Sequence, residues 1–121
     1  MSDGPTLKDL TERIVEFRDA RDWRQFHNPK DLAIALSLEA AELLEPFLWK
    51  RPDQADAVVE NPAALADLRR EIADVMIYVL LLAERLGIDP DQAVLDKLDE
   101  NARKYPVEKS RGNSAKYTEL G

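Results

Sequence analysis

Three helix starts of one kind constrain the fold of this chain more than any other feature. Asn28-Pro29, Asn61-Pro62 and Asp89-Pro90 each place a capping side chain directly before a proline. Proline is favoured at the first helical position because the N–H that it lacks would be unpaired there. The segments that follow contain no glycine and no alternation of β-branched residues, which strands would show. The sequence therefore predicts an all-α fold.

Four helices with short connections are expected, and this arrangement is typical of a four-helix bundle. The first begins after the cap Thr6, and Gly87 is a natural residue to end the third. Pro46 should kink or break the last turn of the second, since proline lacks a donor and clashes with the preceding turn. The predicted helices are residues 7–21, 29–50, 62–86, and 90 up to the stop at Tyr105-Pro106.

The chain length is that of one domain, so residues 1–121 are predicted to form a single domain with a tail at 107–121. The predicted second helix is apolar on nearly its whole circumference, as a helix buried on several sides would be. A small monomer rarely buries one helix completely, which predicts an oligomer. The tail is polar and non-periodic, and taken alone it favours disorder.

Composition excludes several classes of function. The net charge of −7 argues against sequence-independent binding to nucleic acid or to an anionic membrane, because both kinds of binding need a basic face. With no cysteine and one histidine, the chain has no disulfide, no thiol nucleophile and no multi-histidine metal site. No apolar run reaches membrane-spanning length and no signal peptide is visible, so a cytoplasmic protein is expected.

Four carboxylates stand in apolar surroundings, as Glu39 with Glu42 and Glu71 with Asp74, each pair spaced i, i+3 on one helical face. A solvated acidic face would have basic residues one turn away, but only Asp74 has such a neighbour, Arg70. Burying uncompensated carboxylates is costly, so this pattern favours a bound cation. Oxygen ligands without imidazole or thiolate select hard ions, which predicts Mg²⁺, with Mn²⁺ as a substitute.

Aromatic and basic residues suggest a nucleotide site next to these acids. Trp23, Trp49 and Tyr78 could stack on a base, although aromatic residues more often fill a core. His27 is more often a packed or capping residue than a catalyst. Lys97 and Asn101, with Lys104 one turn on, form a stripe that could face phosphates or could be an ordinary solvated face.

With these residues in view, the sequence resembles the MazG-type all-α nucleoside triphosphate pyrophosphohydrolases, and among them the short dCTP pyrophosphatase group. The superfamily signature Glu-x-x-Glu, then Glu-x-x-Asp, is matched by the four acids. The resemblance extends over about residues 7–120. It is carried by the strings at 21–27 (RDWRQFH), 47–50 (FLWK), 74–78 (DVMIY), 97–101 (KLDEN), 103–106 (RKYP) and 114–120 (SAKYTEL).

The resemblance implies that the four acids hold Mg²⁺ and are catalytic, and that the protein is a homotetramer, a dimer of dimers, with its tail ordered. It also implies a substrate site, in which the base is bound by Trp23, Arg24, Gln25, Phe26, His27, Trp49 and Tyr78, and the sugar and phosphates lie near Lys97 and Asn101. The chain departs from the group in two places: Ile14 stands where a histidine is frequent, and the loop at 51–60 is shorter and more acidic.

The function expected from the resemblance is Mg²⁺-dependent hydrolysis of a deoxynucleoside triphosphate between its α and β phosphates. The substrate is expected to be dCTP or a modified dCTP, and the products a monophosphate and pyrophosphate. Glu42 and Glu71 are both candidates for the general base. Two alternatives remain: the same chemistry on another base such as that of dUTP, or a non-catalytic helical module whose acidic face binds a basic protein.

Overall fold

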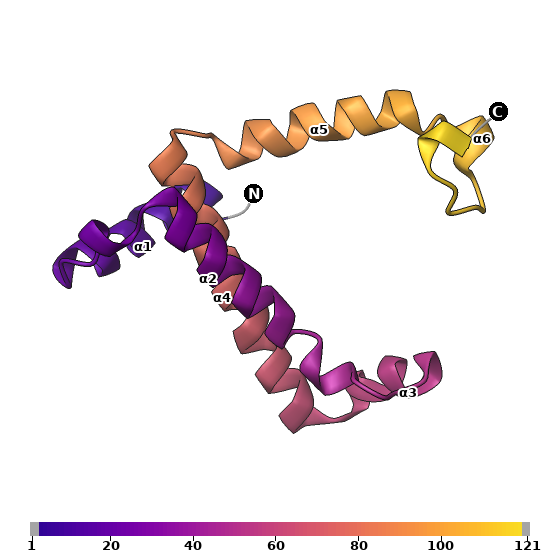
Figure 1. Ribbon diagram of the computed structural model, residues 1–121, viewed down its shortest axis with the longest axis horizontal. Helices are drawn as coiled ribbons and strands as arrows, with labels where there is room; N and C mark the ends of the chain where they lie inside the picture. The colour runs from indigo at the N-terminus through magenta and orange to yellow at the C-terminus, as the bar shows by residue number, and fades with distance from the viewer. Residues whose placement is uncertain (1–2, 120–121) are drawn as a thin grey trace. The chain divides into compact units, whose positions relative to one another are not determined.

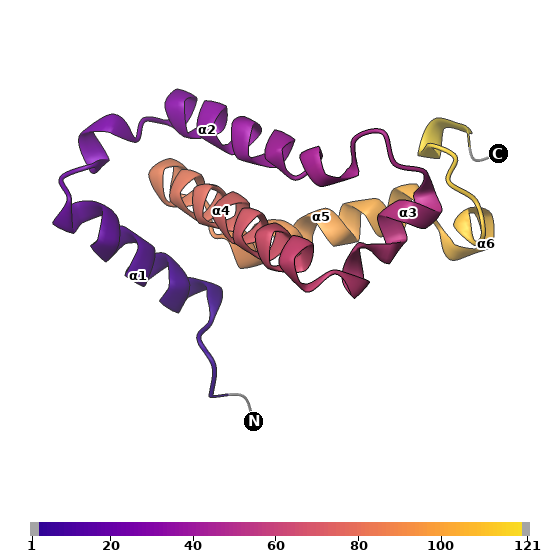
Figure 2. The ribbon, with the colours of Figure 1, turned by 90° about the horizontal axis from the view of Figure 1, so that it is seen from below.

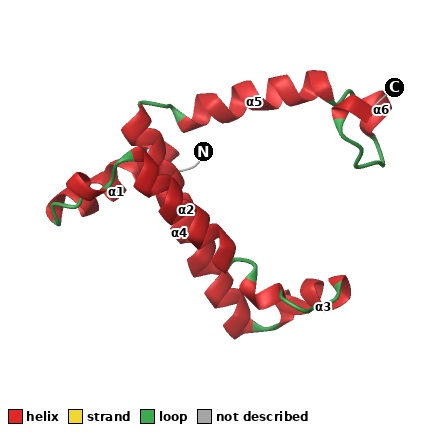
Figure 3. Ribbon diagram, viewed as in Figure 1, coloured by secondary structure: helices red, strands yellow, loops and turns green. Residues whose placement is uncertain are grey.

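The computed structural model describes residues 3–119, and within this range it contains helices and no strand (Figures 1 and 3). The six α-helices are α1 (Leu7–Ala20), α2 (Pro29–Glu42), α3 (Pro52–Asp56), α4 (Pro62–Leu86), α5 (Pro90–Lys104) and α6 (Val107–Ser110). Four 3₁₀ turns join them, η1 (Arg24–Phe26), η2 (Glu45–Phe47), η3 (Ala57–Glu60) and η4 (Tyr117–Glu119). The all-α prediction is confirmed.

The predicted number of four helices is wrong for the described chain, because α3 and α6 are additional. Both are short; α3 begins at Pro52, and α6 begins directly after Pro106. Proline sets φ for a first helical turn, but a single turn has no apolar repeat that periodicity could detect. The acidic connection at 51–60 is therefore partly helical, and the tail contains α6 and η4.

The caps form as the sequence predicts. Thr6 accepts a hydrogen bond from the backbone N–H of Asp9 (3.1 Å), and Asp9 accepts one from the N–H of Thr6 (2.9 Å). The side chains of Asn28, Asn61 and Asp89 accept hydrogen bonds from the first turns of α2, α4 and α5. Gly87 ends α4 with φ 67°, a left-handed conformation that glycine adopts without strain.

The second helix is shorter than predicted, since α2 ends at Glu42 and not near Lys50. Pro46 lies within η2, so the expected break by proline is confirmed, and it takes effect one turn earlier than the proline itself. Trp49 follows with φ 66°, in the left-handed region. Trp49 therefore lies outside both α2 and η2.

The described chain divides into two compact units, residues up to Ile88 and residues from Asp89 onward. In the first unit α4 contacts both α2 and α1, and α2 runs beside α4 in the opposite direction (Figure 2). The buried core of this unit consists of Leu32, Leu68, Leu80 and Leu81. The packing of α2 on α4 is what brings the acidic motifs of the two helices together.

The second unit contains α5, α6 and η4. The apolar side chains of Val94, Leu95 and Leu98 on α5 are each more than half exposed in this single chain. On α2, which the sequence predicts to be buried on several sides, Leu32 is buried but Leu38 is 63% exposed. In the part of the chain that the structure describes, no helix is both long and apolar enough to cross a membrane.

Candidate metal centre and neighbouring cavity

Three carboxylates from two helices converge in the first unit. Glu39 and Glu42 extend from α2, Glu71 extends from α4, and one oxygen of each lies within 4.8 Å of the others. The i, i+3 spacing places the first two on one face of α2, and the packing of α4 adds the third. We call Glu39, Glu42 and Glu71 the acidic cluster.

The acidic cluster has no cationic side chain to balance it. Within residues 3–119, no Lys or Arg forms an ion pair with Glu39, Glu42 or Glu71. Arg70, which the sequence places one turn from Asp74, pairs with Asp67 (2.7 Å). One oxygen each of Glu39 and Glu71 (Oε2) is buried without a hydrogen-bond partner in the described structure. Buried polar atoms are normally paired, so these two atoms call for a ligand.

The proximity of the acids changes their acidity. Burial, together with the hydrogen bonds and negative charges of Glu39 and Glu42, raises the pKa of Glu71 to about 7. Burial also raises the pKa of Glu39, and the charges of Glu42 and Asp74 act in the same direction. Without a cation, the acidic cluster therefore retains a proton close to neutral pH.

The acidic cluster fits a hard divalent cation. It offers oxygen donors alone, and two of those oxygens are buried and unpaired, which suits Mg²⁺, Mn²⁺ or Ca²⁺. Asp74, the fourth predicted ligand, is outside the three-residue group, although its charge acts on Glu39. It lies one turn further along α4, on the wall of a cavity.

This cavity, of about 260 Å³, lies within the first unit, and we call it the base cavity. Its lining combines aromatic, apolar and a few polar side chains: Ile14, Phe17, Arg18, Trp23, His27, Asp74, Ile77, Tyr78 and Leu81. Trp23 packs edge-on against Phe17, with ring centroids 5.8 Å apart, and its centroid is 6.5 Å from that of His27. The structure thus brings together Trp23, His27 and Tyr78 beside Asp74.

Other residues of the predicted substrate site do not line the base cavity. Arg24, Gln25 and Phe26 form the exposed turn η1, where the Gln25 amide donates to the Asp22 carboxylate (2.9 Å). Trp49 is fully exposed. Lys97 and Asn101 belong to α5 in the second unit, where Lys97 pairs with Glu100 (3.0 Å).

The sequence analysis did not identify Arg18 as a site residue. Its side chain is 3% exposed and pairs through Nε with Asp19 and through a terminal nitrogen with Glu84, both at 2.9 Å. A signal was present, because Arg18 lies four residues after Ile14, on the stripe that α1 turns toward α4. An arginine in an apolar stripe indicates a buried cation with a specific partner.

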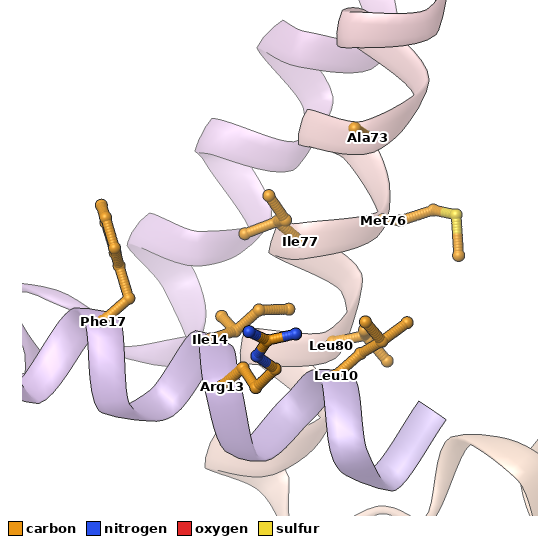
Figure 4. Close-up of a pocket in the computed structure, with 8 residues that line it drawn as sticks. All are labelled: Leu10, Arg13, Ile14, Phe17, Ala73, Met76, Ile77 and Leu80. Carbon is orange, nitrogen blue, oxygen red and sulfur yellow. The ribbon is translucent and has the colours of Figure 1, made fainter. Parts of the chain in front are cut away.

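A larger hollow of about 460 Å³ lies between α1 and α4, and we call it the apolar groove (Figure 4). Figure 4 shows its lining, which α1 and α4 supply in equal parts: Leu10, Arg13, Ile14 and Phe17, then Ala73, Met76, Ile77 and Leu80. It contains no carboxylate and no histidine, so it lacks the groups that hydrolytic chemistry needs.

Comparison with known proteins identifies the class to which this helical fold and its acidic cluster belong. The family model described as the MazG-like family matches residues 34–120. The chain therefore belongs to the MazG-like family.

Individual relatives narrow the class further. The chain is 44% identical over 119 residues to dCTP pyrophosphatase 1 from Bos taurus and from Homo sapiens, which covers 98% of this chain and 70% of each relative. The crystal structure of a pyrophosphatase from Archaeoglobus fulgidus is 41% identical, with a TM-score of 0.78, covering 88% of this chain and 97% of that one. The chain is accordingly a hydrolase related to dCTP pyrophosphatases, and not a non-catalytic helical module.

Proposed function

We propose that this protein hydrolyses deoxynucleoside triphosphates between the α and β phosphates, with dCTP or a base-modified dCTP as the preferred substrate. The products are a nucleoside monophosphate and pyrophosphate. The observation that carries the proposal is the acidic cluster, with its buried unpaired oxygens, next to a cavity lined by aromatic rings. The names of the relatives support the choice of dCTP.

In this proposal Glu39, Glu42 and Glu71 hold Mg²⁺, and Asp74 on the next turn is the fourth ligand. A Mg²⁺ ion held by these residues would supply positive charge for the phosphates and would make a nearby water more acidic. Glu42 or Glu71 accepts the proton of the water that attacks the α phosphorus. The carboxylates would also orient the triphosphate indirectly, since their placement on two packed helices determines where they could hold a cation.

The base is held in the base cavity. Trp23 and Tyr78 offer flat surfaces for stacking, and each stacking contact contributes about 1–3 kcal/mol of binding free energy. Arg24, Gln25, Phe26 and Trp49 complete the pocket in this proposal, with Trp49 turning onto the base from its exposed position. The sugar and phosphates are contacted by Lys97 and Asn101.

The assembly is proposed to be a homotetramer. Apolar side chains on α2 and α5, such as Leu38 and Leu98, are more than half exposed in the single chain. Exposed apolar surface of this kind marks protein interfaces. Light scattering that gives four times the chain mass would support the tetramer, and a monomeric mass would refute it.

The test of the function is a panel of nucleoside triphosphates assayed for pyrophosphate release with Mg²⁺ present or chelated. The proposal requires Mg²⁺-dependent pyrophosphate from dCTP at a higher kcat/KM than from the other bases. Release of orthophosphate instead, or no turnover of any nucleotide, would refute it.

The alternative substrate is another base, such as that of dUTP. The base cavity offers Ile14 on its wall, an aliphatic side chain that makes no hydrogen bond to a base. The same panel distinguishes the two candidates, because a dUTP enzyme would show its highest kcat/KM with dUTP.

A further inference from the structure

Arg18 is a buried cation in the wall of the base cavity. Its side chain is 3% exposed, and it is held between Asp19 on its own helix and Glu84 on α4. The backbone carbonyl of Arg18 also accepts a hydrogen bond from Trp23 (3.1 Å). The two carboxylates therefore hold the guanidinium in place, and Arg18 and Trp23 both belong to the wall of the cavity.

The hydrogen bonds of Arg18 leave part of its guanidinium unused. A guanidinium has five N–H donors, and the bonds to Asp19 and Glu84 use two of them, which leaves three. The side chain is almost completely shielded from bulk solvent. Because Arg18 lines the base cavity, a ligand in that cavity can accept hydrogen bonds from the remaining N–H groups.

The remaining polar groups of the cavity complement an arginine. The Nδ1 atom of His27 is buried without a partner in the described structure. Burial lowers the pKa of His27, and the positive charge of Arg18 lowers it further, so the imidazole is neutral at pH 7 and has one acceptor nitrogen. Asp74 is the other charged group on the wall. The other lining residues are aromatic or aliphatic.

We propose that Arg18 determines base selectivity, by donating two N–H groups to two adjacent acceptors on the edge of the base, while His27 accepts from the neighbouring amine. This inference rests on the proposed function. Cytosine has such an edge, with acceptors O2 and N3 followed by the N4 amine. Uracil carries a hydrogen on N3, which would point at the guanidinium and leave a donor facing a donor.

Guanine presents the same acceptor pair through O6 and N7, the pair that arginine commonly reads in nucleic acids. The proposal is therefore that Arg18 selects this pair of acceptors, with cytosine as the base that carries it in the preferred substrate. Substituents at C5 of cytosine leave the edge unchanged, which is consistent with turnover of modified dCTP.

The test compares the wild type with Arg18→Lys on dCTP, dUTP and dGTP, measuring kcat/KM by pyrophosphate release. Lysine keeps the charge beside Glu84 but lacks the planar fork that reads two acceptors at once. We expect Arg18→Lys to lower kcat/KM for dCTP about ten-fold or more and to change that for dUTP about two-fold or less. The ratio of kcat/KM for dCTP to kcat/KM for dUTP should therefore fall. Any turnover of dGTP should fall with that of dCTP.

Two further variants distinguish a loss of base recognition from a loss of folding. Arg13→Lys changes an arginine on the same helix that does not line the base cavity, and it should leave the ratio unchanged. Arg18→Met combined with Glu84→Met removes the buried ion pair as a unit, which avoids an uncompensated charge, and it should lose the ratio as Arg18→Lys does. Thermal melting of each variant reports whether it is folded.

The outcomes are distinct. An unchanged dCTP-to-dUTP ratio in folded Arg18→Lys or in the double variant would overturn the role of Arg18 while the proposed function stands. An equal loss of ratio in Arg13→Lys would also overturn it. No turnover of any triphosphate by the wild type would refute the proposed function, and with it this inference.

Discussion

The acidic cluster and the apolar groove both use α4, yet they are built on opposite principles. Glu71 joins two acids of α2 with oxygens within 4.8 Å, whereas Met76 and Leu80 face α1 across a hollow without any acid. The apolar groove is larger than the base cavity. It nevertheless offers no group that binds a cation or accepts a proton. The choice of the acidic cluster as the candidate site therefore rests on the arrangement of charge and not on the size of the hollow.

The two regions also differ in how they affect the stability of the folded chain. Like charges held close together without a cationic partner destabilise the folded chain, and a bound cation can relieve that repulsion. Exposed apolar side chains in the groove have a smaller cost, and it is not relieved by an ion. Substitutions in the acidic cluster should consequently change how activity depends on Mg²⁺, and substitutions in the groove should not.

The largest expected effect is that of metal removal. Chelation by EDTA should reduce pyrophosphate release to background, because the triphosphate and the acidic cluster are both anionic and need a bridging cation. Excess Mg²⁺ should restore the rate. Full activity in EDTA would contradict the prediction that the acidic cluster, unlike the groove, works with a metal ion.

Loss of one ligand should come next. Glu71→Gln is expected to lower kcat/KM at least about 100-fold, since an amide oxygen binds a hard cation less tightly than a carboxylate does. Steady-state kinetics across a Mg²⁺ titration would measure this. The matched control is Asp67→Asn, an exposed acid on the same helix whose partner is Arg70.

If the control lost as much activity as Glu71→Gln, general acidity of α4 and not the acidic cluster would be responsible. A Glu71→Gln protein with full turnover would remove Glu71 from the site altogether.

A third expectation concerns pH and stability without metal. The pKa of Glu71 rises from 4.5 to about 7 in the folded protein, so between these values the folded state binds more protons than the unfolded state. The free energy of unfolding should therefore fall as pH rises from about 4.5 to about 7. Thermal melting in EDTA would show a decreasing Tm over this range.

Mg²⁺ should raise the Tm most at the upper end of that range, where the carboxylates are ionised. Glu71→Gln should flatten the profile in EDTA, because the amide does not titrate. A Tm that rises with pH between those limits in the wild type would contradict the raised pKa.

The smallest effect is expected in the apolar groove. Met76 is 46% exposed, and Met76→Ala should change kcat/KM by about two-fold or less, as exposed substitutions away from a site usually do. The concentration of Mg²⁺ that gives half-maximal activity should stay the same. A shift in that concentration would show that the groove and the acidic cluster are coupled through α4.

Local signals explain which parts of the fold were predictable. The caps at Thr6, Asn28, Asn61 and Asp89 were predicted because capping depends on residues three positions apart or fewer. The end of α2 at Glu42 was placed too late, since apolar residues continue to Leu48 while Pro46 stops the helix before them. Single-turn helices such as α3 lie below what periodicity can detect.

In the candidate site, too, the features that depend on local spacing were predicted and the others were not. The spacing of Glu39 with Glu42 and of Glu71 with Asp74 indicated a cation site, and the structure groups the first three of these acids, with Asp74 outside the group. The ion pair of Arg70 was assigned to Asp74, but the guanidinium lies on Asp67 because an i, i−3 neighbour was equally within reach. The placement of Trp49 and of Lys97 relative to the base cavity stays a prediction.

The sequence by itself determined the four long helices, their starting residues and the pairing of acids along α2 and α4, because these depend on contacts within one or two turns. Only the tertiary structure decided that α2 and α4 bring their acids to one point, and that Arg18 is buried between Asp19 and Glu84 in the wall of the base cavity. These contacts join residues far apart in the chain. Their distances follow from how side chains of different helices pack, which no local pattern records.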